Sequence, residues 1–282
     1  MALNDILLHI DTYPDPTPDA AIEAAVALAA KLGGRISAQA YAVQIHLHSN
    51  AIADRLVGLS GLAREEEGRS LAAAQASLAH FATVAGQADV YKDSHLLHAD
   101  LYDLDTVAAK QARTRDLFIV PIEPAPDGQR GVAEAAIFHS GRPVIVFQSG
   151  KAGAPSEVPA IVTVAWDGSR AAARALSDAL PILARAEDVR ILTILGEKPT
   201  AGLGEGAEAA RHLAAHGIAS TVEEIEAKGR GVGAVLEDYL ARTKPDLLVM
   251  GAYGHSRLRE FILGGATQHL LHAPPVPILF SH

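Results

Sequence analysis

Four glycines near the carboxyl end of the chain have a spacing that suits contact with a phosphate group. The apolar run 247–250 leads directly into Gly251, and Gly254 and the pair Gly264-Gly265 follow. Glycine permits positive φ and a close approach of the backbone to a ligand. A helix that starts at about residue 264 would add unpaired N–H groups and the positive end of its dipole. These features predict a phosphate cradle, although glycines after a strand also serve simply to turn the chain.

The elements that would position this loop are short apolar runs that alternate with longer amphipathic segments. Segment 231–244 has apolar residues at helical spacing, and Pro245 ends it. The alternation is typical of β-α-β units, and continuous apolar runs indicate strands covered on both faces. The predicted fold class is therefore α/β, with open, doubly wound parallel sheets. Strands of the second half are expected at 160–166, 189–195, 219–225, 246–251 and 277–280.

The two halves of the chain repeat the same order of elements. "DLFIVP" (116–121) matches "DLLVMG" (246–251), and "RPVIVF" (142–147) matches "VPILFS" (276–281). The recurrence of these segments in the same order indicates duplication, with five strands in each copy. We predict a first domain at 1–148, a Gly-, Pro- and Ser-rich linker at 149–159, and a second domain at 160–282.

The composition limits the class of partner. A formal net charge of −9 disfavours a broad surface for nucleic acid or for an anionic membrane. The absence of cysteine excludes disulfides and thiolate chemistry. The sequence starts without a basic, apolar leader and has no apolar run of about 18 residues, so we expect a cytoplasmic protein.

The arrangement as a whole resembles the universal stress protein family in its tandem, two-domain form. The family signature is Gly, two residues, Gly, nine residues, Gly, and then Ser or Thr. Gly251, Gly254 and Gly264 match it in register, and Asp167 ends the first strand of the same copy. The resemblance implies the strand order 3-2-1-4-5, an aspartate near adenine or ribose, and a glycine loop around the ribose and phosphates.

The implied cofactor is ATP or another adenine nucleotide, with or without Mg²⁺. One departure concerns the residue after the third glycine, which is Gly265 instead of Ser or Thr and removes one hydroxyl donor. Backbone N–H groups of the following residues would remain, and His255, Ser256, Arg257 and Arg259 could offset the loss electrostatically. No catalytic or metal-binding set is predicted. The predicted binding residues are Asp167, Gly251, Gly254, His255, Arg257, Gly264, Gly265, Ala266 and Thr267.

The first copy lacks the glycine signature. Asp11 is the counterpart of Asp167, but Glu123 and Asp127 stand where phosphates would lie. Because carboxylates repel a triphosphate, we expect a degenerate copy without nucleotide. It would pack against the second copy as a pseudo-dimer, through 144–147 against 277–280, and whole chains could form a homodimer.

Three interpretations of function stay open. The first is a stress-response protein that binds ATP and acts through nucleotide-dependent interaction. The second is a slow ATPase or phosphotransferase in which Asp167 or His255 has a catalytic role, and the third is an interaction scaffold without nucleotide.

Several other patterns in the chain carry weaker hypotheses. A metal site could use His46 with His48 in an extended segment, or His95 with His98 on one helical face. "GRGVG" (229–233) is interpreted as a loop and helix cap, and Ser169 as a helix N-cap.

Overall fold

The computed structural model describes residues 3–46, 59–123, 128–148, 158–196, 205–252 and 265–282. In the first half the elements are β1 (Asp5–Ile10), α1 (Asp19–Leu32), β2 (Arg35–Gln44), α3 (Leu59–Gln87), β3 (Tyr91–Asp100), α4 (Leu104–Ala112), β4 (Leu117–Ile122), α5 (Gly128–His139) and β5 (Val144–Gln148). In the second half they are β6 (Ile161–Ala165), α6 (Arg170–Leu183), β7 (Asp188–Leu195), α7 (Glu205–Ala215), β8 (Thr221–Glu226), α8 (Val232–Thr243), β9 (Leu247–Gly251), α9 (Gly265–His272) and β10 (Ile278–Ser281).

The described strands form one ten-stranded sheet in the order β3-β2-β1-β4-β5-β10-β9-β6-β7-β8. Each half has the strand order 3-2-1-4-5 and parallel pairing, which confirms the predicted fold class. The halves meet where β5 and β10 pair antiparallel, with Ile278 opposite Val146 and Phe280 opposite Val144. The expected pairing of 144–147 with 277–280 is therefore confirmed, and it merges the two predicted sheets into one.

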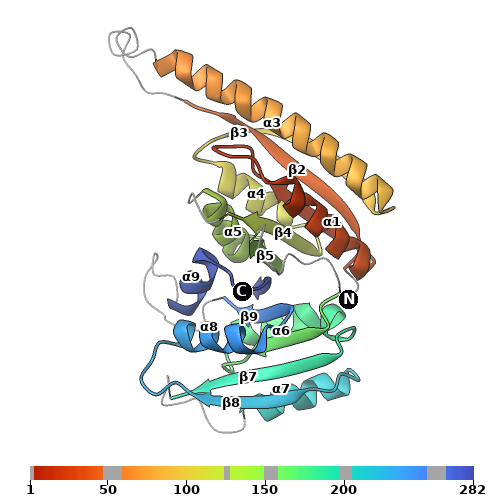
Figure 1. Cartoon of the computed structure of the whole chain (residues 1–282), viewed down its shortest axis with the longest axis vertical. Helices are drawn as coiled ribbons and strands as arrows, with labels where there is room; N and C mark the ends of the chain where they lie inside the picture. Colours follow the sequence, from red (N-terminus) through yellow and green to blue (C-terminus); the bar gives the residue numbers. More distant parts are fainter. Residues whose placement is uncertain (1–2, 47–58, 124–127, 149–157, 197–204, 253–264) are drawn as a thin grey trace.

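Helices cover both faces of this sheet (Figure 1). One apolar core lies between the sheet and α1, α3, α6 and α7, and the other lies between the sheet and α4, α5, α8 and α9. Both cores run across the β5–β10 junction, since Phe147 and Leu279 belong to the first core and Val146 and Phe280 to the second. The continuous apolar strands of the sequence are therefore explained by burial on two sides.

Two equivalent aspartates show the repeat in atomic detail. Asp116 precedes β4, and its Oδ2 accepts hydrogen bonds from the backbone N–H groups of Asn4 and Asp5 at 2.9 and 3.0 Å. Asp246 precedes β9, and its Oδ2 accepts from the N–H groups of Ala160 and Ile161, both at 2.9 Å. In each half one carboxylate thus fixes the start of the first strand to the start of the fourth.

The halves differ most between their second and third strands. Helix α3 has 29 residues, whereas its counterpart α7 has 11, and Figure 1 shows α3 running along the long strands β2 and β3. The segment 91–100 is strand β3, so His95 and His98 lie on opposite faces of it and the expectation of a shared helical face is wrong. Residues i and i+3 lie on the same face of a helix but on opposite faces of a strand, so the same spacing gives opposite predictions. Residues 149–157 of the predicted linker lie outside the described residues, so the domain boundaries stay predictions.

Candidate functional site

Asp167 lies at the turn between β6 and α6, at the carboxyl end of β6. Its Oδ1 accepts a hydrogen bond from the N–H of Ser169 at 3.0 Å, and Gly168 has φ +71°. Ser169 is the N-cap of α6, as predicted, because its Oγ accepts from the N–H of Ala172 at 3.1 Å. Asp167 is partly exposed, so the turn holds a carboxylate at the surface beside the start of a helix.

Gly251 ends β9, the strand beside β6, and the structure gives a packing reason for its lack of a side chain. A Cβ at this position would lie 2.4 Å from the carbonyl carbon of Ala171 and 2.4 Å from the backbone nitrogen of Ala172. The first turn of α6 therefore lies directly against the end of β9. Since Asp167 lies in the turn that leads into this helix, the structure brings Gly251 and Asp167 to the same end of two neighbouring strands.

Helix α9 begins at Gly265 and covers the same face of the sheet as α8. The first-turn N–H groups of Gly265, Ala266 and Thr267 have no acceptor within the helix, and the helix dipole makes this end electropositive. Gly265 is exposed and has no positive φ, and within the described ranges no neighbouring atom lies within 4 Å of the place a Cβ would occupy. Thr267 is buried, since the residue is 3% exposed.

Contacts with α8 determine where α9 lies. A Cβ on Gly233 would be 3.2 Å from Cβ of His269 and 3.3 Å from Cα of Ala266, so the helices approach closely at this glycine. His269 Nε2 also lies 2.7 Å from a carboxylate oxygen of Glu237. Gly231 is the N-cap of α8, which confirms the loop-and-cap interpretation of "GRGVG" and shows that Gly233 serves helix packing.

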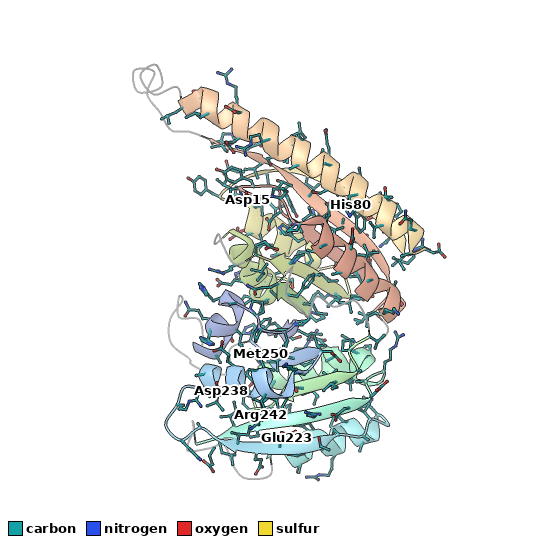
Figure 2. The ribbon with its side chains drawn as sticks, viewed as in Figure 1. Asp15, His80, Glu223, Asp238, Arg242 and Met250 are labelled. Carbon is teal, nitrogen blue, oxygen red and sulfur yellow. The ribbon has the colours of Figure 1, made fainter. Side chains whose placement is uncertain are left out.

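Among the residues that the structure describes, two hollows lie beside α8. The first, of about 400 Å³, runs along α9 from Gly265 to Ala273 and is bordered by Glu237. The second, of about 480 Å³, lies between β8 and α8. Figure 2 shows Asp238 and Arg242 on α8 near this strand. Asp238 forms an ion pair with Arg230 at 2.6 Å. The lining also holds Glu224 and Glu226 with Lys228 and Arg242, so its formal charges balance.

The equivalent place in the first half is filled by side chains. Asp11 is the counterpart of Asp167, but it is 5% exposed and lies 3.1 Å from Nε2 of His9, which is 1% exposed. The ring of Tyr41 lies against His9, with centroids 5.5 Å apart, and its hydroxyl donates to Oε1 of Gln39 at 2.6 Å. Strand register gives Ala165 as the counterpart of His9 and Ile194 as that of Tyr41. Smaller residues thus occupy both positions in the second half.

This occlusion is a feature that the sequence analysis missed. The prediction of a site without nucleotide rests on Glu123 and Asp127, of which Asp127 lies outside the described residues. Burial raises the pKa of Glu123, which weakens the argument from charge repulsion at that residue. The usable signal was His9 in an otherwise apolar run, two residues before the aspartate.

Some predicted residues are not covered by the structure. Gly254, His255, Arg257 and Gly264 lie outside the described residues, as do Ser256, Arg259 and His48. Within the described ranges, no group of three or more His, Asp or Glu side chains is arranged to hold a metal ion. His46 hydrogen-bonds Asp100 and His95 pairs with Asp93 at 3.2 Å. In the same ranges, no helix has both the length and the apolar character of a membrane span.

Comparisons with known proteins agree with this architecture. Residues 160–282 match the model of the universal stress protein family. The fold of the whole chain is similar to that of a universal stress protein from Archaeoglobus fulgidus, with a TM-score of 0.66, 17% identity, and coverage of 98% of this chain and 95% of that one. A second protein named for the same family, from Pseudomonas aeruginosa, gives a TM-score of 0.58 and 16% identity, with coverage of 99% of this chain and 93% of that one. Among curated proteins, none matches this sequence.

Proposed function

Because residues 160–282 belong to the universal stress protein family, we propose that this half binds an adenine nucleotide, with ATP as the preferred candidate. We further propose that the chain acts in a stress response through an interaction that depends on the bound nucleotide. The observation that supports one site per chain is the contrast between Asp167, which is partly exposed, and Asp11, which His9 and Tyr41 enclose.

In this proposal different described residues contact different parts of the nucleotide. Asp167 would accept hydrogen bonds from the adenine or ribose. The N–H groups of Gly265, Ala266 and Thr267 would bind phosphate oxygens at the positive end of α9. Gly251 contributes indirectly, since its lack of a side chain lets the start of α6, and with it Asp167, lie close to the end of β9.

Isothermal titration of ATP into the full chain tests the proposal. We expect saturable binding to the wild type with one nucleotide per chain. Asp167→Asn should weaken binding by about tenfold, or about 1.4 kcal/mol, because an amide is a poorer acceptor than a carboxylate. Asp238→Asn makes the same change at an exposed carboxylate of α8 and should leave binding unchanged.

A second variant tests the position of the phosphates. Gly265→Ser supplies the missing hydroxyl, and the described surroundings of this helical position leave room for it. A hydrogen bond to a charged group contributes about 1.5 to 3 kcal/mol, so affinity should rise by about tenfold or more. Failure of both the wild type and Gly265→Ser to bind any adenine nucleotide would leave the fold assignment intact and favour a scaffold without nucleotide.

A further inference from the structure

Helix α9 is too short to be stable without contacts to other elements. It has eight residues, and isolated helices shorter than about 12 residues are marginal in water. Its first turn carries the proposed phosphate donors, so the orientation of α9 sets the direction in which those N–H groups point. Contacts at the C-terminal end of α9 therefore affect the orientation of these N–H groups.

One of these contacts comes from the first half of the chain. Nη2 of Arg130, in α5, donates to the backbone carbonyl oxygen of His272 at 3.2 Å, across 142 residues of sequence. His272 is the last residue of α9, and its carbonyl has no partner within the helix. A guanidinium at this end both satisfies the carbonyl and interacts favourably with the helix dipole.

A second contact joins α5 to the beginning of the glycine segment. The N–H of Ala252, directly after β9, donates to the carbonyl of Ser281 at 2.8 Å. The Ala252 carbonyl oxygen lies 3.1 Å from Nδ1 of His282. The His282 ring in turn meets the ring of Phe138, in α5, edge to face with centroids 5.2 Å apart. Helix α5 is therefore linked to Ala252, which follows β9, through His282, and to the last residue of α9 through Arg130.

We propose that α5 of the first half is part of the nucleotide site of the second half. Arg130 and Phe138 are positioning residues that hold α9 and Ala252, the residue directly after β9, in the geometry that receives phosphate. This inference rests on the proposed function. It assigns the degenerate first half a role, which is to set the nucleotide affinity of the second half through the shared interface. Helices α5 and α9 lie side by side at this interface (Figure 1).

The test compares full-length Arg130→Ala with a matched arginine of the same half. Nε of Arg142 donates to the backbone carbonyl of Arg113, at the end of α4, at 2.9 Å. Arg142→Ala therefore also removes a bond between an arginine and a helix end, but the helix is α4 instead of α9. Arg130→Lys keeps the positive charge and should recover part of any effect.

Amide hydrogen exchange of residues 265–272 without nucleotide is the first measurement. We expect exchange about two- to fivefold faster in Arg130→Ala and unchanged exchange in Arg142→Ala. Titration with ATP is the second measurement, and we expect about three- to tenfold weaker binding by Arg130→Ala. Phe138→Leu, which keeps apolar volume but removes the aromatic edge contact, should also weaken binding.

The two measurements separate this inference from the proposed function. A wild type that binds no adenine nucleotide refutes the proposed function, and the exchange data still decide whether α5 holds α9. Faster exchange in Arg130→Ala with unchanged ATP affinity would refute the link to the site. Equal exchange in wild type, Arg130→Ala and Arg142→Ala would overturn the inference entirely.

Discussion

Replacement of Gly251 by alanine tests whether this glycine serves packing. The added Cβ would lie 2.4 Å from two backbone atoms of the first turn of α6. Carbon atoms in good contact are about 3.5 to 4.0 Å apart, so the overlap exceeds about 1 Å. Backbone atoms cannot rotate away as a flexible side chain can, and β9 and α6 must separate. Overpacking of this kind costs about 1 to 3 kcal/mol, and we expect the upper end.

Thermal unfolding followed by circular dichroism measures this cost. Since 1 kcal/mol corresponds to about 2 to 4 °C in a protein of this size, Gly251→Ala should lower the melting temperature by about 6 to 12 °C. Gly265→Ala is the matched control, because it adds the same methyl group to a helical glycine where no neighbouring atom of the described residues lies within 4 Å. It should melt within about 2 °C of the wild type or slightly higher. Equal melting temperatures for the two variants would refute the packing explanation of Gly251.

Three further predictions concern the two halves and their interface. Tyr41→Phe leaves the buried Oε1 of Gln39 without its 2.6 Å donor. The free energy of unfolding, measured in urea, should fall by about 1 to 3 kcal/mol. Tyr102→Phe changes an 82% exposed residue and should have no effect. Burial raises the pKa of Glu134 and the charge of Arg130 opposes this rise, so Arg130→Ala should raise this pKa further. A carboxyl pKa that is raised on folding contributes fully to stability below its ordinary value of 4.5, and this contribution is lost as the pH rises. Arg130→Ala should therefore lose more stability than the wild type as the pH rises above 4.5 in thermal melts. Residues 158–282 alone should self-associate in light scattering, because β10 would expose the edge that pairs with β5.

Each of these has a result that contradicts it. Equal urea midpoints for Tyr41→Phe and the wild type would show that Gln39 finds another donor. An unchanged pH dependence in Arg130→Ala would mean that Arg130 does not act on Glu134. If residues 158–282 stay monomeric at micromolar concentration, the exposed edge of β10 does not drive self-association and the prediction is wrong.

Local patterns predicted the elements of this protein closely. The helix expected at 231–244 is α8 at Val232–Thr243, and the strand expected at 246–251 is β9 at Leu247–Gly251. Such elements depend on neighbours a few residues apart, so helical spacing, continuous apolar runs and a stop at proline are sufficient evidence for them. The histidines of β3 show the limit, because His95 and His98 fit a helical pattern that the strand does not adopt.

The sequence by itself determined the α/β class, the duplication, the strand order implied by family resemblance, and the glycine motif that suggests a phosphate ligand. Only the tertiary structure decided what surrounds these residues. It places α6 against Gly251, encloses Asp11 with His9 and Tyr41, and brings Arg130 to the end of α9. Arg130 and His272 are 142 residues apart, and their contact follows from how helices from both halves pack on one sheet. No periodicity in the chain records such a contact, because it depends on the three-dimensional arrangement and not on the spacing of either residue from its neighbours.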